Sequence, residues 1–310
     1  TIILNELKKV GLKPITELED YYHCNLAKVF ENAPSEEESH AKFADLINSG
    51  MIYEIFGKYT PPTEEFPLPT ELLVTIPRAT TALFVIGRGS GGEECDRRLE
   101  EDYYLTESEK QMIDSVASHF SNIILVLNIN GFIDLSWTNN YPCLKSVLYL
   151  GTAGEQGAAA LSNILIGKAS PSGKLAATIA LSYEDYPSAS SFFTNKDKPE
   201  TILTYADYQL SAEENGSYGF EKSPIAVYLE GIYVGYRYFD TFNKPVLYPL
   251  GFGLSYADFE FEFLYSELRD EALSLTFTVT NKSKEFSGKE VAELYVSAPD
   301  GLLKKPYQEL

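Results

Sequence analysis

A strand–loop–helix–strand pattern between Ala82 and Gly131 constrains the fold of this chain more than any other feature. Leu83 to Ile86 is a short apolar run followed by glycines, as in a buried strand that leaves a sheet. Thr106 and Glu109 have the spacing of a helix capping box, and Ile123 to Leu127 is apolar on both faces, which is typical of a parallel strand covered by helices. The pattern predicts one βαβ unit. In such sheets the ligand lies outside the carboxyl ends of the strands, so we expect any chemistry in the loop after Ile86.

The rest of the chain divides into an α/β part and a β part. We predict strands near residues 83–87, 123–128, 146–150 and 175–179, with 123–128 inside a mainly parallel sheet sandwiched by helices. The first strand of a doubly wound domain is missing before the helical residues 2–10, so we expect it upstream of this sequence. Two-residue alternation begins at Phe259 and predicts antiparallel strands in residues 259–268, 272–281 and 289–299.

These patterns predict two domains, an α/β sandwich in residues 1–256 and a partial β domain in residues 257–310. The second domain has about three predicted strands, fewer than the ~7 of an immunoglobulin-like sandwich, so we expect it to continue beyond residue 310. Residues 228–240 are ambiguous. If they form a strand, Tyr236 and Tyr238 share one face and Tyr233 points to the other, and we favour a core or domain-interface role for most of these rings.

Composition excludes several classes of function. The formal net charge of -20 argues against a nucleic-acid partner, because phosphate binding needs a basic surface. No apolar run approaches the ~20 residues of a membrane span, so no membrane partner is expected. Three well-separated cysteines (Cys24, Cys95 and Cys143) do not form a disulfide framework, which favours the cytoplasm. Their spacing is not that of a zinc motif, so we predict no metal site. We expect no cofactor either. A nucleotide-binding domain is disfavoured because the glycine fingerprint is absent.

Several motifs occur in a characteristic order along the chain. They are Gly91 to Arg97 with Asp102 to Leu105, Pro171 to Leu175, Gly231 to Asp240, Pro249 to Tyr256, and Gly288 to Val291 with Leu294 to Ser297. Together they resemble glycoside hydrolase family three, in particular its β-glucosidases. The resemblance runs from about Thr80 to the end and includes the start of a fibronectin type III-like domain after residue 257.

The resemblance implies a retaining glycosidase with the chemistry divided between domains. In such enzymes a (β/α) barrel supplies the aspartate nucleophile, and a loop of the α/β sandwich supplies the acid/base glutamate. Aligning on Asp96 and Arg97, the supporting residues of that loop, places Glu93 at the acid/base position. The loop has one extra residue between Arg88 and Glu93, and Glu94 stands where relatives have glycine, so Glu94 is the alternative acid/base.

The resemblance further implies a β-glucoside or related oligosaccharide as substrate and a catalytic barrel of the same protein as partner. Homo-oligomerisation is left open. The acid must keep its proton near neutral pH, which crowding by Glu94 and Asp96 favours and the basic trio Arg88, Arg97 and Arg98 opposes. The chain contains no matched nucleophile, so we expect it to be inactive alone. The alternative function is a non-catalytic carbohydrate-binding or scaffolding module.

Overall fold

A parallel sheet of three strands lies at the centre of the computed structural model, which describes residues 2–31, 34–49, 65–78, 80–88, 99–190, 207, 225, 227–270 and 272–310. Its strands are β1 (Thr81–Gly87), β2 (Asn122–Asn128) and β3 (Leu144–Tyr149). They lie in that order, so β2 pairs with a parallel neighbour on each side. The predicted strands near 83–87, 123–128 and 146–150 are confirmed, and so is the interior position of 123–128.

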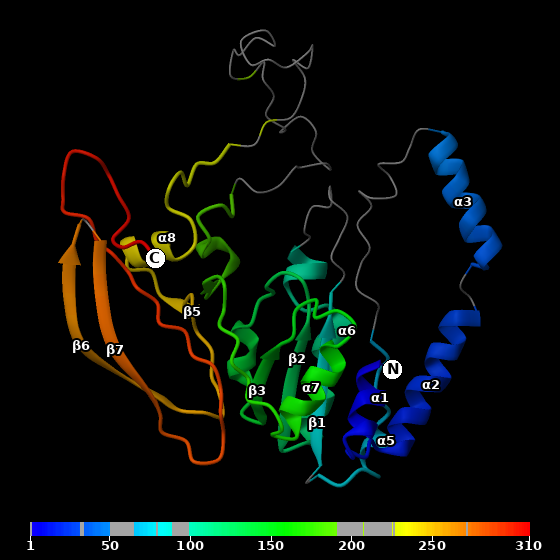
Figure 1. Ribbon diagram of the computed structural model, residues 1–310. Helices are drawn as coiled ribbons and strands as arrows, with labels where there is room; N and C mark the ends of the chain where they lie inside the picture. The colour runs from blue at the N-terminus through cyan, green and yellow to red at the C-terminus, as the bar shows by residue number, and fades with distance from the viewer. Residues whose placement is uncertain are drawn as a thin grey trace.

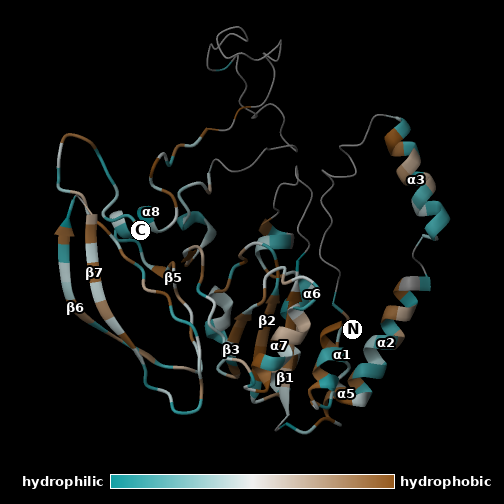
Figure 2. Ribbon diagram, in the orientation of Figure 1, coloured by the Kyte–Doolittle hydropathy of each residue, from teal (hydrophilic) through white to brown (hydrophobic). Residues whose placement is uncertain are grey.

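Helices cover both faces of this sheet. Alternate residues of a strand point to opposite faces, and the neighbouring residues Leu125 and Val126 of β2 are both fully buried. On one face Leu125 shares a core with Met112 and Ile113 of α6 (Glu107–His119). Figure 1 shows α7 (Gly157–Leu165) in front of the sheet, and Figure 2 shows β2 and β3 as hydrophobic ribbons. The predicted fold class, a parallel sheet sandwiched by helices, is confirmed.

The N-terminal part of the chain is helical. The predicted helix at residues 2–10 is α1 (Ile2–Lys9), which packs against α7. α2 (Thr16–Glu31) and α3 (Glu36–Asn48) follow, and Figure 1 shows α3 standing away from the sheet. A short helix, α5 (Thr70–Leu73), then leads into β1.

The fourth predicted strand, at residues 175–179, is wrong. Only Ile179–Ala180 forms a strand, β4, and it pairs antiparallel with β5 (Val246–Tyr248) rather than with the parallel sheet. The reason lies at Leu175, whose N–H donates to the Phe252 carbonyl and whose carbonyl accepts from the Gly251 N–H, at 2.9 and 2.8 Å. The main-chain groups of Leu175 are therefore bonded to the loop at Gly251 and Phe252, and they are not free to pair with a strand of the parallel sheet.

The predicted antiparallel strands are confirmed for two of the three runs. β6 (Phe259–Arg269) and β7 (Ala272–Asn281) form a hairpin that stands beside the α/β part in Figure 1. The third run, residues 289–299, is not a strand and makes one isolated bridge, between Val296 and Glu309. The predicted division of the chain at residue 257 is tested by no further observation and stays a prediction.

Residues 228–240 are not a strand either. They form turns followed by α8 (Tyr236–Thr241), so the faces expected for a strand do not apply. The Tyr236 ring packs edge-on against Tyr295, and its hydroxyl accepts from the Leu310 N–H at 2.7 Å. Tyr233 packs against Phe242. These contacts agree with the predicted packing role of the tyrosines.

In the part of the chain that the structure describes, no helix is long and apolar enough to cross a membrane. Among those same residues, no three His, Cys, Asp or Glu side chains gather as metal ligands would.

Candidate functional site

The candidate site lies where β1 ends. The predicted residues Glu93, Glu94, Asp96 and Arg97 all fall in residues 89–98, outside the described part, so their positions are not tested. The structure does describe both flanks of this segment. Arg88 follows β1 directly, and a π-helical turn, η1 (Leu99–Tyr103), resumes the chain.

Arg88 ties the two flanks together. Its side chain is 2% exposed, and its Nε donates to the Asp102 carbonyl at 3.0 Å. Its Nη1 donates to the Gly87 carbonyl at 2.9 Å, and its Nη2 lies 3.5 Å from the Tyr104 carbonyl oxygen. One buried guanidinium therefore bonds the main chain both before and after residues 89–98.

Glu109 supplies the countercharge. Its two carboxylate oxygens accept from Nη1 and Nη2 of Arg88 at 2.5 and 2.8 Å, a bidentate pair. The same carboxylate accepts from the Thr106 N–H at 2.8 Å, which confirms the predicted capping box at the start of α6. Arg88 is one of the three arginines expected to favour ionisation of the loop carboxyls, and the structure shows it paired with Glu109. The loop carboxyls lie outside the described residues, so that expectation stays a prediction. The capping pattern identified Glu109 but did not indicate its second partner.

Aromatic side chains hold the second flank. Tyr103 is buried and packs edge-on against Tyr104 and against Tyr183 of the short turn η3 (Tyr183–Asp185), at 5.1 and 5.2 Å between ring centroids. Its main-chain carbonyl accepts from the Asp134 N–H at 2.9 Å. Burial, reinforced by Tyr186 and Asp134, raises the pKa of the Tyr103 hydroxyl, so Tyr103 stays neutral at physiological pH. Ring packing and a main-chain hydrogen bond therefore anchor the second flank.

A third carboxyl group lies close to the Arg88–Glu109 pair. Glu65 donates its main-chain N–H to the Ser108 hydroxyl of α6 at 3.2 Å. Burial, and then repulsion by Glu109, raise the pKa of the Glu65 carboxyl, and attraction to Arg88 only partly offsets them. The Glu65 charge is therefore unfavourable in the folded protein.

We expect Glu65→Gln to stabilise the protein near neutral pH and to have little effect near pH 4. The raised pKa means that the folded state binds more protons than the unfolded state, so stability falls as pH rises from the ordinary glutamate pKa through the raised value. Glutamine at position 65 carries no charge and removes this loss of stability. Thermal unfolding of the wild type and of Glu65→Gln between pH 4 and pH 8 measures the difference in stability, and the exposed Glu107→Gln is the control. A wild-type advantage that grows with pH contradicts the prediction.

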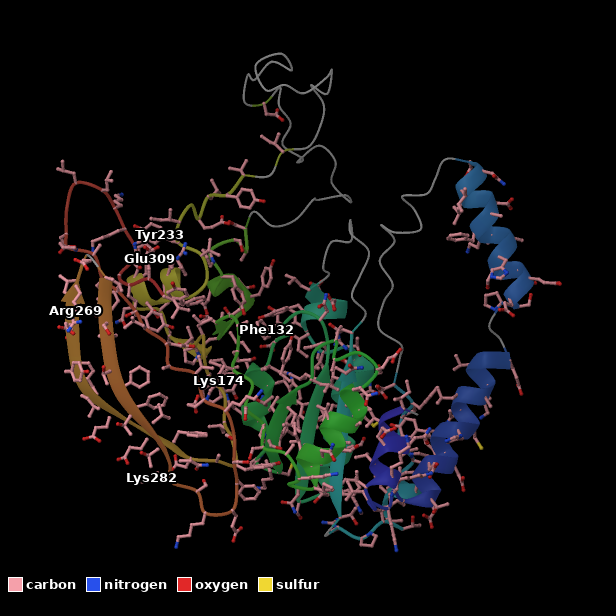
Figure 3. All side chains as sticks on the ribbon, in the orientation of Figure 1. Phe132, Lys174, Tyr233, Arg269, Lys282 and Glu309 are labelled. Carbon is pink, nitrogen blue, oxygen red and sulfur yellow. The ribbon has the colours of Figure 1, made fainter. Side chains whose placement is uncertain are left out.

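Three of the sequence motifs meet at a junction beside the sheet. Lys174 Nζ lies 2.8 Å from Glu290 Oε1 and donates to the Gly253 carbonyl at 2.8 Å. The Ser172 hydroxyl oxygen accepts from the Lys289 N–H at 3.0 Å. Figure 3 labels Lys174 on the side of the α/β part that faces the C-terminal segment. The first two residues of the run 289–299, which is not a strand, therefore bind the α/β part.

The junction leaves no space for larger residues. A Cβ atom at Gly253 would lie 2.4 Å from the Gly173 carbonyl oxygen, much closer than atoms in contact. The pKa of the Glu290 carboxyl is lowered, first by its hydrogen bond from Lys174 and then by the Val291 N–H. The motif residues here therefore serve packing between two parts of the chain.

The fold and these flanks define an α/β domain with a candidate functional loop at the carboxyl edge of its parallel sheet. The family model of the glycosyl hydrolase family 3 C-terminal domain matches residues 40–236. The chain belongs to this family.

Individual relatives agree with that assignment. The chain is 37% identical over 227 residues to β-glucosidase A of Butyrivibrio fibrisolvens, covering 67% of this chain and 24% of the relative. It is 33% identical over 244 residues to a β-glucosidase of Ruminococcus albus, and the match covers 78% of this chain and 22% of the relative. The solved structure of β-glucosidase 3B from Thermotoga neapolitana in complex with α-D-glucose is similar with a TM-score of 0.72 at 28% identity, covering 99% of this chain and 37% of that one. This chain thus corresponds to a minor part of each relative.

Proposed function

We propose that this chain is the part of a retaining β-glucosidase-like enzyme that carries the acid/base loop. The observation that carries the proposal is the family membership of residues 40–236 together with the glutamates of residues 89–98. The nucleophile belongs to a catalytic barrel of the same parent protein. The small shares of the β-glucosidase relatives that this chain covers, 24% and 22%, support a partner domain of that kind.

Retaining hydrolysis explains why the chain needs such a partner. One carboxylate attacks the anomeric carbon while a second carboxyl group, about 5 to 5.5 Å away, protonates the leaving oxygen. Glu93 takes the second role, with Glu94 as the alternative one position along. Asp96 and Arg97 support the loop. After the glycosyl-enzyme forms, the same glutamate accepts a proton from the attacking water.

The substrate is a β-glucoside or a related oligosaccharide, in line with the β-glucosidase relatives. The fibronectin type III-like character of residues 257–310 belongs to the same proposal, supported by the β6–β7 hairpin. The cytoplasmic location stays a prediction.

The isolated chain is expected not to hydrolyse aryl β-glucosides, because one carboxyl group cannot serve as both nucleophile and acid. The intact parent protein is expected to hydrolyse them with retention of the anomeric configuration. Release of the aryl group measures hydrolysis by either protein. NMR of the first-formed sugar measures its anomeric configuration. A parent protein without glycosidase activity would support the carbohydrate-binding or scaffolding alternative. Turnover by the isolated chain that Glu93→Gln abolishes would place a nucleophile within it.

A further inference from the structure

Two aromatic rings lie together at the carboxyl ends of β2 and β3. Phe132, labelled in Figure 3, follows β2, and Tyr149 is the last residue of β3. Their ring centroids are 5.3 Å apart, with 42° between the ring planes. Phe132 is partly buried and packs against the hydrophobic core, whereas Tyr149 is 42% exposed. The pair therefore presents an aromatic surface to solvent at this edge of the sheet, and Phe132 connects that surface to the core.

The Tyr149 ring is held in place without being covered. Its hydroxyl donates to the main-chain carbonyl of Asn130 at 3.0 Å, and its ring contacts Phe132. Gly151 has a φ of +63°, which favours glycine. A Cβ atom at Gly151 would lie 3.6 Å from Cε1 of the Tyr149 ring, so glycine keeps that part of the ring free of a neighbouring side chain. A ring that is already fixed loses little freedom when a ligand binds to it.

The place and the chemistry of this ring pair fit a sugar. Open α/β sheets bind their ligands at the carboxyl ends of the strands, which is where both rings lie. A glucosyl unit of a β-linked chain has C–H groups on its faces and hydroxyl groups around its rim, so one face can stack on an aromatic ring. The chain has a formal net charge of -20, which disfavours an anionic ligand and leaves a neutral sugar unaffected.

We propose, on the basis of the proposed function, that Tyr149 supported by Phe132 binds a glucosyl unit of an oligosaccharide substrate beyond the unit that is cleaved. The candidate acid/base glutamates follow β1 in the sequence. β3 lies two strand spacings from β1, which is about 10 Å. This separation assigns the ring pair to a further sugar unit rather than to the reacting one.

The test is a matched pair of variants in the intact parent enzyme, Tyr149→Phe and Tyr149→Leu. Both lose the hydroxyl and its bond to Asn130, and only phenylalanine keeps the flat ring. The two substrates are a β-linked glucotriose and methyl β-glucoside, whose methyl group has no sugar face to stack. We expect Tyr149→Leu to lower kcat/KM for the glucotriose about 10-fold more than kcat/KM for methyl β-glucoside, the upper end of what one aromatic contact contributes. Tyr149→Phe is expected to keep most of the wild-type ratio.

The ratio of these two kcat/KM values does not depend on how much of the sample is folded, so a loss of stability does not obscure it. Tyr265→Leu is the control, because Tyr265 is a 57% exposed tyrosine on β6. It is expected to leave the ratio unchanged. Calorimetric titration with a thio-linked glucotriose, which resists hydrolysis, measures binding without catalysis. Tyr149→Leu is expected to bind it more weakly than Tyr149→Phe does.

Three outcomes would overturn the sugar contact. They are an equal loss on both substrates for Tyr149→Leu, an equal change of the ratio for Tyr149→Leu and Tyr149→Phe, and a change for Tyr265→Leu as large as that for Tyr149→Leu. A parent protein without glycosidase activity refutes the proposed function, and the titration then decides the contact separately. Weaker binding by Tyr149→Leu than by Tyr149→Phe supports the contact in that case, and equal binding refutes it.

Discussion

Glu93→Ala in the intact parent enzyme is expected to slow hydrolysis of poor leaving groups by about 10²–10⁴-fold, the usual range for general acid/base assistance. A very good leaving group needs little protonation, so the first step should be nearly normal for dinitrophenyl β-glucoside. Deglycosylation should be slow for every substrate, because the general base is also lost. Azide should then accelerate turnover and give a β-glucosyl azide, since a small anion can occupy the space of the missing carboxylate.

Glu94→Ala is the matched control one position along the chain, and a much smaller effect is expected. Steady-state kinetics with a series of aryl glucosides, followed by product analysis in azide, compares the two variants directly. Equal effects, or the absence of both rescue and azide product, would refute the assignment. A dominant effect of Glu94→Ala would show that the extra residue after Arg88 shifts the alignment by one position.

Arg88→Met is expected to lower the free energy of unfolding by about 3–5 kcal/mol, because it leaves the buried Glu109 carboxylate without its charged partner. The side chains of Arg88 and Glu109 are only 2% and 6% exposed, so little water can solvate the carboxylate that the substitution leaves unpaired. Urea denaturation of the 310-residue chain can be followed by the fluorescence of Trp137. This is the only tryptophan, lies in the 3₁₀ turn η2 (Ser136–Asn140) and packs against the core.

Lys110→Met is the matched control from the same helix. Lys110 lies 4.0 Å from Glu107 at the surface, with exposures of 56% and 75%, and such pairs contribute about 0–1 kcal/mol. Similar losses for the two variants would mean that the buried pair contributes little to stability. The Glu109→Gln, Arg88→Met double variant should recover part of the loss, since it removes the unpaired charge.

Local patterns in the sequence were sufficient for much of the α/β part. The Thr106 and Glu109 spacing identified the start of α6, because a capping box is complete within four residues. The apolar run at 123–127 identified a buried parallel strand, since a strand covered by helices on both faces is apolar on both faces. The motif order indicated the family, which the match to residues 40–236 confirms.

The errors fall where distant segments compete for the same backbone groups. Residues 175–179 have strand-forming side chains, yet Gly251 and Phe252 take the hydrogen bonds of Leu175. Residues 289–299 alternate like a strand, yet Ser172 and Lys174 bind their first residues. No local pattern contains information about a partner 75 or more positions away.

The sequence by itself determined the class of fold, the residue ranges of β1 to β3, the interior position of β2, the family and the segment that holds the candidate acid/base glutamates. Hydrophobic period and helix capping are local, and motifs are linear, so each can be recognised without coordinates. Only the tertiary structure decided that Arg88 faces Glu109 and the carbonyls of Asp102 and Tyr104. A buried charge takes whichever partners the fold brings within hydrogen-bonding distance, and that selection is made by packing.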